Sequence, residues 1–255
     1  MGQKANAISL RLGVNRSWEA QWFIEGRKYG SLLHRDLLTH SFLTRVHEKE
    51  DALVGRILLQ RQRKKLYIFL HLYQPKGDVK QTLLQGSLLE KALIKINGGK
   101  IDLKVVDLLQ TQKSSRIALS KHLAPSLSTY QSRPYFQDAL NLITVSLLTQ
   151  NTSLLAKYFA QQIEKDFRHN PFIDFLKKAL PLFVDNLPEV KGLRFQFKGR
   201  LNGSDRSKIQ WFQYGQVAFQ TLDQKVDYGY APAFTPYGVC GIKVWVVYDT
   251  PQDKI

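Results

Sequence analysis

Residues 193–200, Leu-Arg-Phe-Gln-Phe-Lys-Gly-Arg, alternate apolar and polar side chains. Successive side chains of a β-strand point to opposite faces of its sheet, so this pattern predicts a strand with one buried apolar face and one cationic face. The same alternation recurs at 242–246, Ile-Lys-Val-Trp-Val. We therefore expect the last part of the chain, residues 193–247, to be rich in strands.

Two helices are expected ahead of these strands. Apolar side chains recur at steps of four from Leu155 through Phe159 to Ile163, which is the spacing of one helix face. Asn170-Pro171 then provides the cap and proline that commonly begin another helix. Because two helices on a mainly antiparallel sheet would bury both sets of apolar side chains, the sequence predicts a C-terminal α+β domain at residues 153–250.

A second α+β domain is predicted at residues 26–110. Its expected elements are a helix starting at the cap candidate Ser31, two strands, a helical segment and a strand, at 31–46, 54–60, 66–73, 79–96 and 101–105. The first helix is expected to bury one stripe of apolar side chains, namely Leu33, Leu37, Leu38, Phe42 and Val46. A three-stranded sheet covered on one face by helices would bury these stripes. The type II KH fold, an RNA-binding module, has this order of elements.

Two further segments complete the expected organisation. Residues 1–25 are predicted to form an extended basic N-terminal tail. Residues 111–152 are interpreted as an insertion or linker, with a loop or partly disordered stretch up to Pro134. A strongly apolar helix near 135–148 should then pack against another surface.

The charge of the chain points to a polyanionic partner. Lys and Arg total 37 against 21 Asp and Glu, which gives a formal net charge of +16 and a pI near 9.8. A surplus of this size repels itself unless an anionic partner neutralises it, and nucleic acid is the usual partner. The alternative is a soluble basic protein with a solvated surface.

The cations cluster around the strand at 193–200. Residues 191–208 contain six basic side chains and one acid, namely Lys191, Arg194, Lys198, Arg200, Arg206, Lys208 and Asp205. Cations spaced along a sheet suit a phosphate backbone, because each contact releases counterions and arginine can donate two hydrogen bonds to one phosphate. An ordinary solvated strand face is the alternative. A second basic cluster, Arg61 to Lys65, falls at a predicted turn, where simple exposure to solvent is an equal explanation.

Several other classes of protein find no support in the sequence. The six histidines show no metal-ligand spacing, and the single cysteine, Cys240, cannot form an internal disulfide and is interpreted as a small core residue. No Gly-rich phosphate loop occurs, and no apolar run approaches the roughly 18 residues of a membrane span. We therefore expect no enzyme activity, cofactor, metal, membrane or small-molecule substrate. An RNA-processing enzyme that carries a KH-like module is a competing class of protein. It would need clusters of acidic or metal-ligating side chains, and the sequence pattern shows none.

Both ends of the chain carry motifs that resemble a known family. Residues 1–18 read Met-Gly-Gln-Lys-Ala-Asn-Ala-Ile-Ser-Leu-Arg-Leu-Gly-Val-Asn-Arg-Ser-Trp. Near the other end, Gly-Arg-Leu-Asn-Gly at 199–203 is followed by Trp211, by Val-Asp-Tyr-Gly at 226–229 and by the block 237–245. These blocks, in this order, resemble the S-three family of small-subunit ribosomal proteins over roughly residues 1–110 and 153–248.

The resemblance implies a location on the head of the small subunit, at the entrance of the mRNA channel. There the protein would bind ribosomal RNA and neighbouring head proteins, and it would help to guide mRNA. The residues assigned to ribosomal RNA under this reading are the tail cations Lys4, Arg11 and Arg16 together with Lys191, Arg194, Lys198, Arg200, Arg206 and Lys208. Lys177 and Lys178 are assigned to the mRNA channel. The helix near 135–148 is interpreted as a docking element for a neighbouring ribosomal protein.

The chain departs from the family pattern at two places. The KH loop is normally Gly-x-x-Gly with lysines inside, whereas Leu83 to Gly86 keep one glycine and no lysine. Two arginines of the channel-facing helix in bacterial members, which assist unwinding of mRNA, align with Ile173 and Asp174. We therefore expect neither RNA binding in the usual KH groove nor full unwinding assistance.

The same departures, with the insertion at 111–152, favour a mitochondrial member of the family. The expected location is the mitochondrial ribosome, with the bacterial cytoplasm or a plastid as the alternative. Residues 1–18 contain basic and no acidic side chains, which suits either a transit peptide or an RNA-contacting tail. The family's start at residue 1 favours the tail. A free regulatory RNA-binding protein with a KH-like module is the alternative function.

Overall fold

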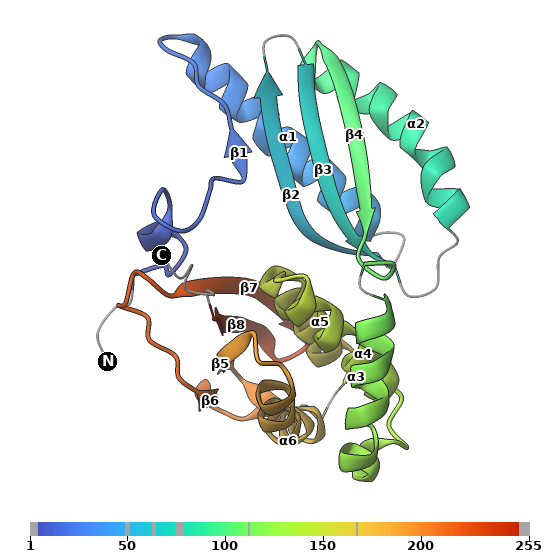
Figure 1. Ribbon diagram of the computed structural model, residues 1–255, viewed down its shortest axis with the longest axis vertical. Helices are drawn as coiled ribbons and strands as arrows, with labels where there is room; N and C mark the ends of the chain where they lie inside the picture. The colour runs from blue at the N-terminus through green and yellow to red at the C-terminus, as the bar shows by residue number, and fades with distance from the viewer. Residues whose placement is uncertain are drawn as a thin grey trace. The chain divides into compact units, whose positions relative to one another are not determined.

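The computed structural model describes residues 5–48, 52–62, 65–74, 79–111, 113–166 and 168–249, with the backbone alone at 79–87. Contacts between Cα atoms divide the chain into two units. The KH-like unit comprises the described residues of 18–111, and the C-terminal unit comprises those of 1–17 and 112–255. Figure 1 shows a sheet and helices in each unit.

The KH-like unit has the predicted order of elements. They are β1 (Ala20–Gln21), α1 (Lys28–Glu48), β2 (Leu53–Gln62), β3 (Lys65–Tyr73), α2 (Val79–Asn97) and β4 (Lys100–Asp107). The sheet order is β1-β2-β3-β4, with β2 antiparallel to β3 and β4 parallel to β3. Leu43 of α1 and Leu93 of α2 share one core cluster with Ile68 and Leu70 of β3, so both helices cover the same face. The helix-covered sheet is thereby confirmed, and β1 adds a short parallel edge strand.

The prediction of which face of α1 is buried is wrong. Leu33, Leu37 and Leu38 are 39%, 61% and 44% exposed, and the predicted Phe42 and Val46 are only half-buried. The helix instead buries Asp36, Thr39, Leu43 and His47, spaced three or four residues apart. Hydrophobic spacing cannot reveal this face, because polar side chains can be buried when they are hydrogen-bonded.

The polar side chains beneath α1 form one hydrogen-bonded network. The Asp36 carboxylate accepts hydrogen bonds from the indole N–H of Trp22 at 2.6 Å and from the guanidinium of Arg61. Arg61 also donates to Asn97 Oδ1 at 2.8 Å, and the Asn97 amide donates to Thr39 Oγ1 at 3.0 Å. The network therefore joins α1, β2 and the end of α2, and it compensates the cost of burying their polar groups.

Among its described residues the C-terminal unit contains three 3-10 segments, η1 (Ser9–Arg11), η2 (Pro125–Tyr130) and η3 (Leu201–Gly203), besides its helices and strands. Its elements are α3 (Lys113–Leu123), η2 (Pro125–Tyr130), α4 (Phe136–Leu148), α5 (Thr152–Lys165), α6 (Asn170–Asn186), β5 (Val190–Gly199), β6 (Lys208–Gly215), β7 (Lys225–Thr235) and β8 (Gly238–Tyr248). The sheet is wholly antiparallel in the order β6-β5-β8-β7. Helix α5 packs on β7 and β8, and α6 packs on β5 and β6. The predicted pair of helices on an antiparallel sheet is confirmed.

The insertion differs from its prediction. The stretch expected to be a loop contains α3 and η2. Helix α4 is predicted correctly, but its apolar side chains are buried in its own unit, where Ile143 and Leu147 lie beside Leu155 and Leu176. The interpretation of α4 as a docking helix for another protein is therefore wrong, since its apolar face already has a partner.

Asp227 and Gly229 of β7 fix the start of α5 against the sheet. The Asp227 carboxylate accepts a hydrogen bond from the backbone N–H of Thr152 at 2.9 Å, and thus serves as a helix cap supplied by a strand. A Cβ atom at Gly229 would lie 2.3 Å from the Thr152 carbonyl oxygen, so only glycine permits this approach. This geometry gives a structural reason for Val-Asp-Tyr-Gly at 226–229.

Candidate nucleic-acid interface

The strand predicted to carry cations has the expected alternation. Phe195 and Phe197 of β5 are buried, whereas Arg194 and Gln196 are half-buried and Lys198 is exposed. Cross-strand partners share a face of an antiparallel sheet, so the strand register extends this surface over all four strands. We call it the outer face. It comprises Arg194, Gln196, Lys198, Ile209, Trp211, Gln213, Tyr228, Tyr230, Pro232, Phe234, Val239, Gly241, Lys243 and Trp245.

The outer face combines cations with exposed aromatic rings. Among the described residues that form it there are three cations and no carboxylate. Trp211, Tyr230 and Phe234 are 54%, 53% and 68% exposed. A positive surface with exposed rings is the composition of surfaces that contact phosphates and bases.

Arg194 is held in an aromatic cage rather than extended into solvent. Its guanidinium carbon lies 4.7 Å from the centroid of Trp211, 5.5 Å from Phe219 and 5.7 Å from Trp245. Burial lowers the pKa of Arg194, because desolvation disfavours the charged form. Arg194 therefore orders the rings around it and is less available to phosphate than the sequence predicted.

The two described tail cations, Arg11 and Arg16, bind oxygen atoms within the C-terminal unit. Arg11 is fully buried, and its guanidinium donates hydrogen bonds to the carbonyl oxygens of Ala7, Phe219, Thr221 and Gln224 at 2.7–3.0 Å. Desolvation also lowers its pKa. The assignment of Arg11 to RNA is therefore corrected to a structural role. The residue fastens η1 to the loop before β7.

Arg16 has a comparable internal role. It forms an ion pair with Asp227 at 2.5 Å, with side-chain exposures of 14% and 4%, respectively. Asn15 adds a hydrogen bond to the carbonyl oxygen of Leu222 at 2.8 Å. The described part of the predicted extended tail, up to Ser17, is thus part of the C-terminal unit. The remaining tail cation, Lys4, lies outside the described residues.

The other predicted cations are on the surface of the C-terminal unit. Arg200, Arg206 and Lys208 are exposed near the β5–β6 connection, and Arg200 donates a hydrogen bond to the Ser204 carbonyl oxygen at 2.7 Å. Lys191 forms an exposed ion pair with Asp249 at 2.6 Å. The structure thus brings Arg200, Arg206 and Lys208 together at one connection.

The predicted channel lysines are exposed on α6. Lys177 forms an ion pair with Asp174 at 3.2 Å, and the Lys178 ammonium lies 5.3 Å from the centroid of Tyr130. Ile173, which aligns with a family arginine, is buried. The backbone of 83–86, aligned with the KH loop, continues through α2 without a break.

Sequence reasoning missed Lys243, Trp211, Tyr230 and Phe234 as candidate site residues. The alternation at 242–246 already placed Lys243 opposite the apolar side chains, so its exposure was available from the sequence. The three aromatic residues carried no comparable signal, because an aromatic ring on a strand is usually part of a core.

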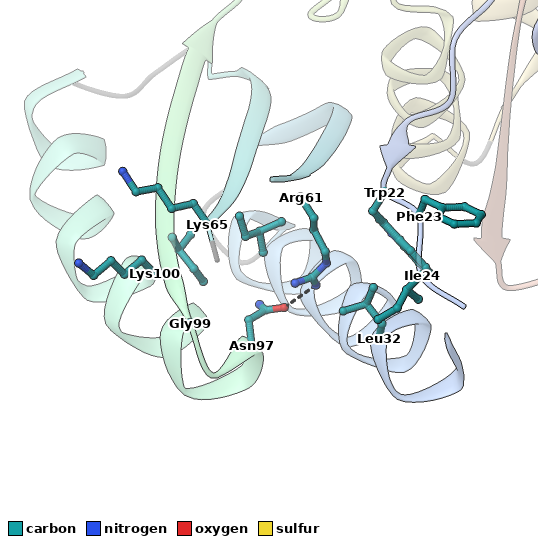
Figure 2. Close-up of a pocket in the computed structure, with 11 residues that line it drawn as sticks. Trp22, Phe23, Ile24, Leu32, Arg61, Lys65, Asn97, Gly99 and Lys100 are labelled. Carbon is teal, nitrogen blue, oxygen red and sulfur yellow. Dashed lines mark hydrogen bonds between the residues drawn. The ribbon is translucent and has the colours of Figure 1, made fainter. Parts of the chain in front are cut away.

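The second basic cluster is less suited to phosphate. Figure 2 shows Arg61 directed at Asn97 within a pocket of the KH-like unit, while the side chains of Lys65 and Lys100 extend away from them. Arg61 is already bound to Asp36 and Asn97. Arg63 and Lys64 lie outside the described residues.

No cluster of three or more His, Cys, Asp or Glu side chains able to hold a metal ion occurs among the residues that the structure describes. Within the same part of the chain, no helix is long and apolar enough to cross a membrane. Cys240 is buried beneath the sheet as predicted, and burial raises the pKa of its thiol.

Comparison with known proteins agrees with the two motif-bearing ends of the chain. The family model for the C-terminal domain of ribosomal protein S3 matches residues 160–246. The small ribosomal subunit protein uS3 of Methylocella silvestris is 31% identical over 246 residues, covering 96% of this chain and 84% of that protein. The corresponding protein of Bradyrhizobium diazoefficiens is 31% identical over 247 residues with the same coverage of both chains. That of Caulobacter sp. strain K31 is 28% identical over 246 residues, 96% of this chain and 81% of its own.

The fold, the basic outer face and these similarities define a non-enzymatic structural protein of the small ribosomal subunit. The chain belongs to the uS3 family, which is the S-three family indicated by its terminal motifs.

Proposed function

We propose that the C-terminal unit binds ribosomal RNA in the head of the small subunit, near the entrance of the mRNA channel. The observation that carries this proposal is the cationic surface formed by Lys198 and Lys243 on the outer face and by Arg200, Arg206 and Lys208 beside it. An ordered sheet fixes the backbone positions of the two lysines, so no backbone ordering is needed on binding. Neutralisation of phosphates and release of counterions supply most of the affinity.

Charge reversal tests this proposal. The variant Lys198→Glu, Arg206→Glu, Lys208→Glu should incorporate poorly into the small subunit, measured by gradient sedimentation of tagged protein. The matched control reverses three exposed lysines of the same unit, in Lys113→Glu, Lys121→Glu, Lys165→Glu. Both variants change the net charge equally, so a defect in the first alone assigns the loss to the surface near β5. Equal incorporation of both would refute the proposed interface.

Lys177 and Lys178 are proposed to contact mRNA at the channel. Their exposure supports the contact, whereas buried Ile173 and the Asp174–Lys177 ion pair give no support to full unwinding assistance. The double variant Lys177→Gln, Lys178→Gln should weaken crosslinking of mRNA to this protein in assembled subunits without weakening subunit assembly. Unchanged crosslinking would exclude the contact.

The proposed location is a mitochondrial ribosome, with a bacterial or plastid ribosome as the alternative. The insertion at 111–152 and the altered residues at 83–86 and 173–174 support the mitochondrial assignment. Mass spectrometry of gradient-purified mitochondrial ribosomes from the source organism should detect the protein. Its recovery from another ribosome population alone would reject the assignment.

A further inference from the structure

We propose that the outer face binds unpaired nucleotides, with bases stacked on Trp211 and Tyr230 and phosphates held by Lys243 and Lys198. This inference rests on the proposed function and deepens it, because it names single-stranded RNA as the element recognised. The register gives the geometry. Trp211 pairs with Gln196, Gln196 pairs with Lys243, and Lys243 pairs with Tyr230, so these four side chains form one row across the sheet.

The row has a ring at each end and two polar side chains between them, an arrangement that suits single-stranded RNA. Adjacent strands are about 4.8 Å apart, so Trp211 and Tyr230, three strand spacings apart, are separated by roughly 14 Å. Lys243 lies between them, and Lys198 lies in the next row, opposite Gly241. Glycine at that position leaves room for the Tyr230 ring, because a Cβ atom at Gly241 would lie 3.6 Å from Tyr230 Cε2. The ring therefore lies beside Lys243 and Lys198 on the same surface.

Trp211 is positioned as a stacking platform. It is 54% exposed even though the Arg194 guanidinium lies 4.7 Å from its centroid, so the cage orders the ring while leaving much of it in solvent. Tyr230 at the other end of the row is 53% exposed. Stacking on such rings tolerates any base and requires that the base be unpaired.

Duplex RNA fits this surface less well. In an A-form helix the base faces are covered by neighbouring pairs, so the exposed rings of the protein cannot stack on them. Only phosphates, 2′-hydroxyls and base edges in the minor groove remain accessible. Two exposed aromatic side chains in one row with a lysine therefore favour unpaired RNA. The absence of any carboxylate among the described outer-face residues removes repulsion of phosphate.

Binding of the full-length protein to a 12-nucleotide RNA without self-complementarity, compared with the blunt duplex of the same sequence, tests the proposal. Fluorescence anisotropy should give tighter binding of the single strand by wild type. Trp211→Leu should weaken single-strand binding about tenfold and duplex binding less than twofold. Trp211→Phe should restore most of the affinity, since it retains a ring. Trp18→Leu, at a 62% exposed tryptophan of the KH-like unit, is the matched control and should bind as wild type.

The outcomes separate the two proposals. If Trp211→Leu and Trp211→Phe bind the single strand as tightly as wild type while Lys198→Glu, Lys243→Glu loses binding, stacking is wrong and the phosphate-binding surface survives. If wild type binds neither RNA, the stacking proposal fails, whereas the incorporation assay still decides whether the C-terminal unit binds ribosomal RNA. If Trp211→Leu instead abolishes binding of a purified head protein and leaves RNA affinity unchanged, the outer face is a protein interface and the stacking proposal is overturned.

Discussion

The N-terminal segment and the outer face of the C-terminal sheet use positive charge in opposite ways. Arg11 and Arg16 are buried or nearly so, with carbonyl and carboxylate oxygens as partners, whereas Lys198 and Lys243 extend from the sheet into solvent. The planar guanidinium offers five donors in a fixed fork and can satisfy several internal acceptors at once. An ammonium on a flexible stem is better kept in water. Within these two regions, arginine fastens the chain and lysine remains available to a partner.

Removal of Arg11 should have the largest effect. Arg11→Met leaves four carbonyl oxygens without their donor, and we expect the free energy of unfolding to fall by about 3 kcal/mol. Urea unfolding of the full chain measures this loss. Lys198→Met removes an exposed cation and should change stability by less than about 0.5 kcal/mol. Equal losses for the two variants would contradict the division between fastening and free cations.

The KH-like unit offers a second test, at a fastening arginine in another core. Asp36→Ala leaves Arg61 and the Trp22 indole N–H without their acceptor, and should cost about 2–3 kcal/mol. Leu37→Ala, at the neighbouring position but 61% exposed, should cost less than about 0.5 kcal/mol. Thermal and urea unfolding compare the two variants directly. A larger loss of unfolding free energy for Leu37→Ala would instead support the buried face of α1 that was predicted from the hydrophobic spacing.

The lysines of the outer face should alter binding without altering stability. Lys198→Gln and Lys243→Gln are each expected to reduce the slope of log affinity for RNA against log salt concentration by roughly 1. Binding isotherms at four salt concentrations give the slope, and urea unfolding provides the stability control. A lysine whose replacement lowers stability and leaves the slope unchanged would belong with Arg11 and Arg16.

The smallest expected effect is on the pH dependence of stability, and it concerns His169, which contacts the segment that carries Arg200. Buried His169 accepts a hydrogen bond at Nδ1 from the backbone N–H of Asn202 at 3.1 Å, next to Arg200, and desolvation lowers its pKa below the usual 6.5. Protons then bind the unfolded state first as pH falls, so stability is full above about pH 6.5 and declines below it. His169→Asn should flatten this decline, measured as unfolding free energy from pH 7.5 to 5. An unchanged pH dependence would show that another group is responsible.

The extent of prediction differs between elements for identifiable reasons. Alternation at 193–198 gave the buried and exposed faces of β5, because the period of a strand is fixed by its backbone. Spacing at 155–163 and the Asn-Pro pair at 170–171 gave α5 and α6. The loop expected at 111–134 is partly helical, since a polar composition is compatible with a short surface helix such as α3.

Residue patterns alone predicted the class of fold, the cationic character of the strand face and, through the terminal motifs, the family. Which cations remain available to a partner became clear from the folded structure. Arg11, Arg194 and Lys198 are all basic in the sequence, but their surroundings in the folded protein differ, because they come from other parts of the chain. Arg11 donates hydrogen bonds to carbonyl groups at 219–224, Arg194 packs against Trp211 and Trp245, and Lys198 is exposed to solvent. Whether a cation is buried or available to a partner depends on the groups that folding brings around it. Such long-range contacts produce no periodic pattern in the sequence.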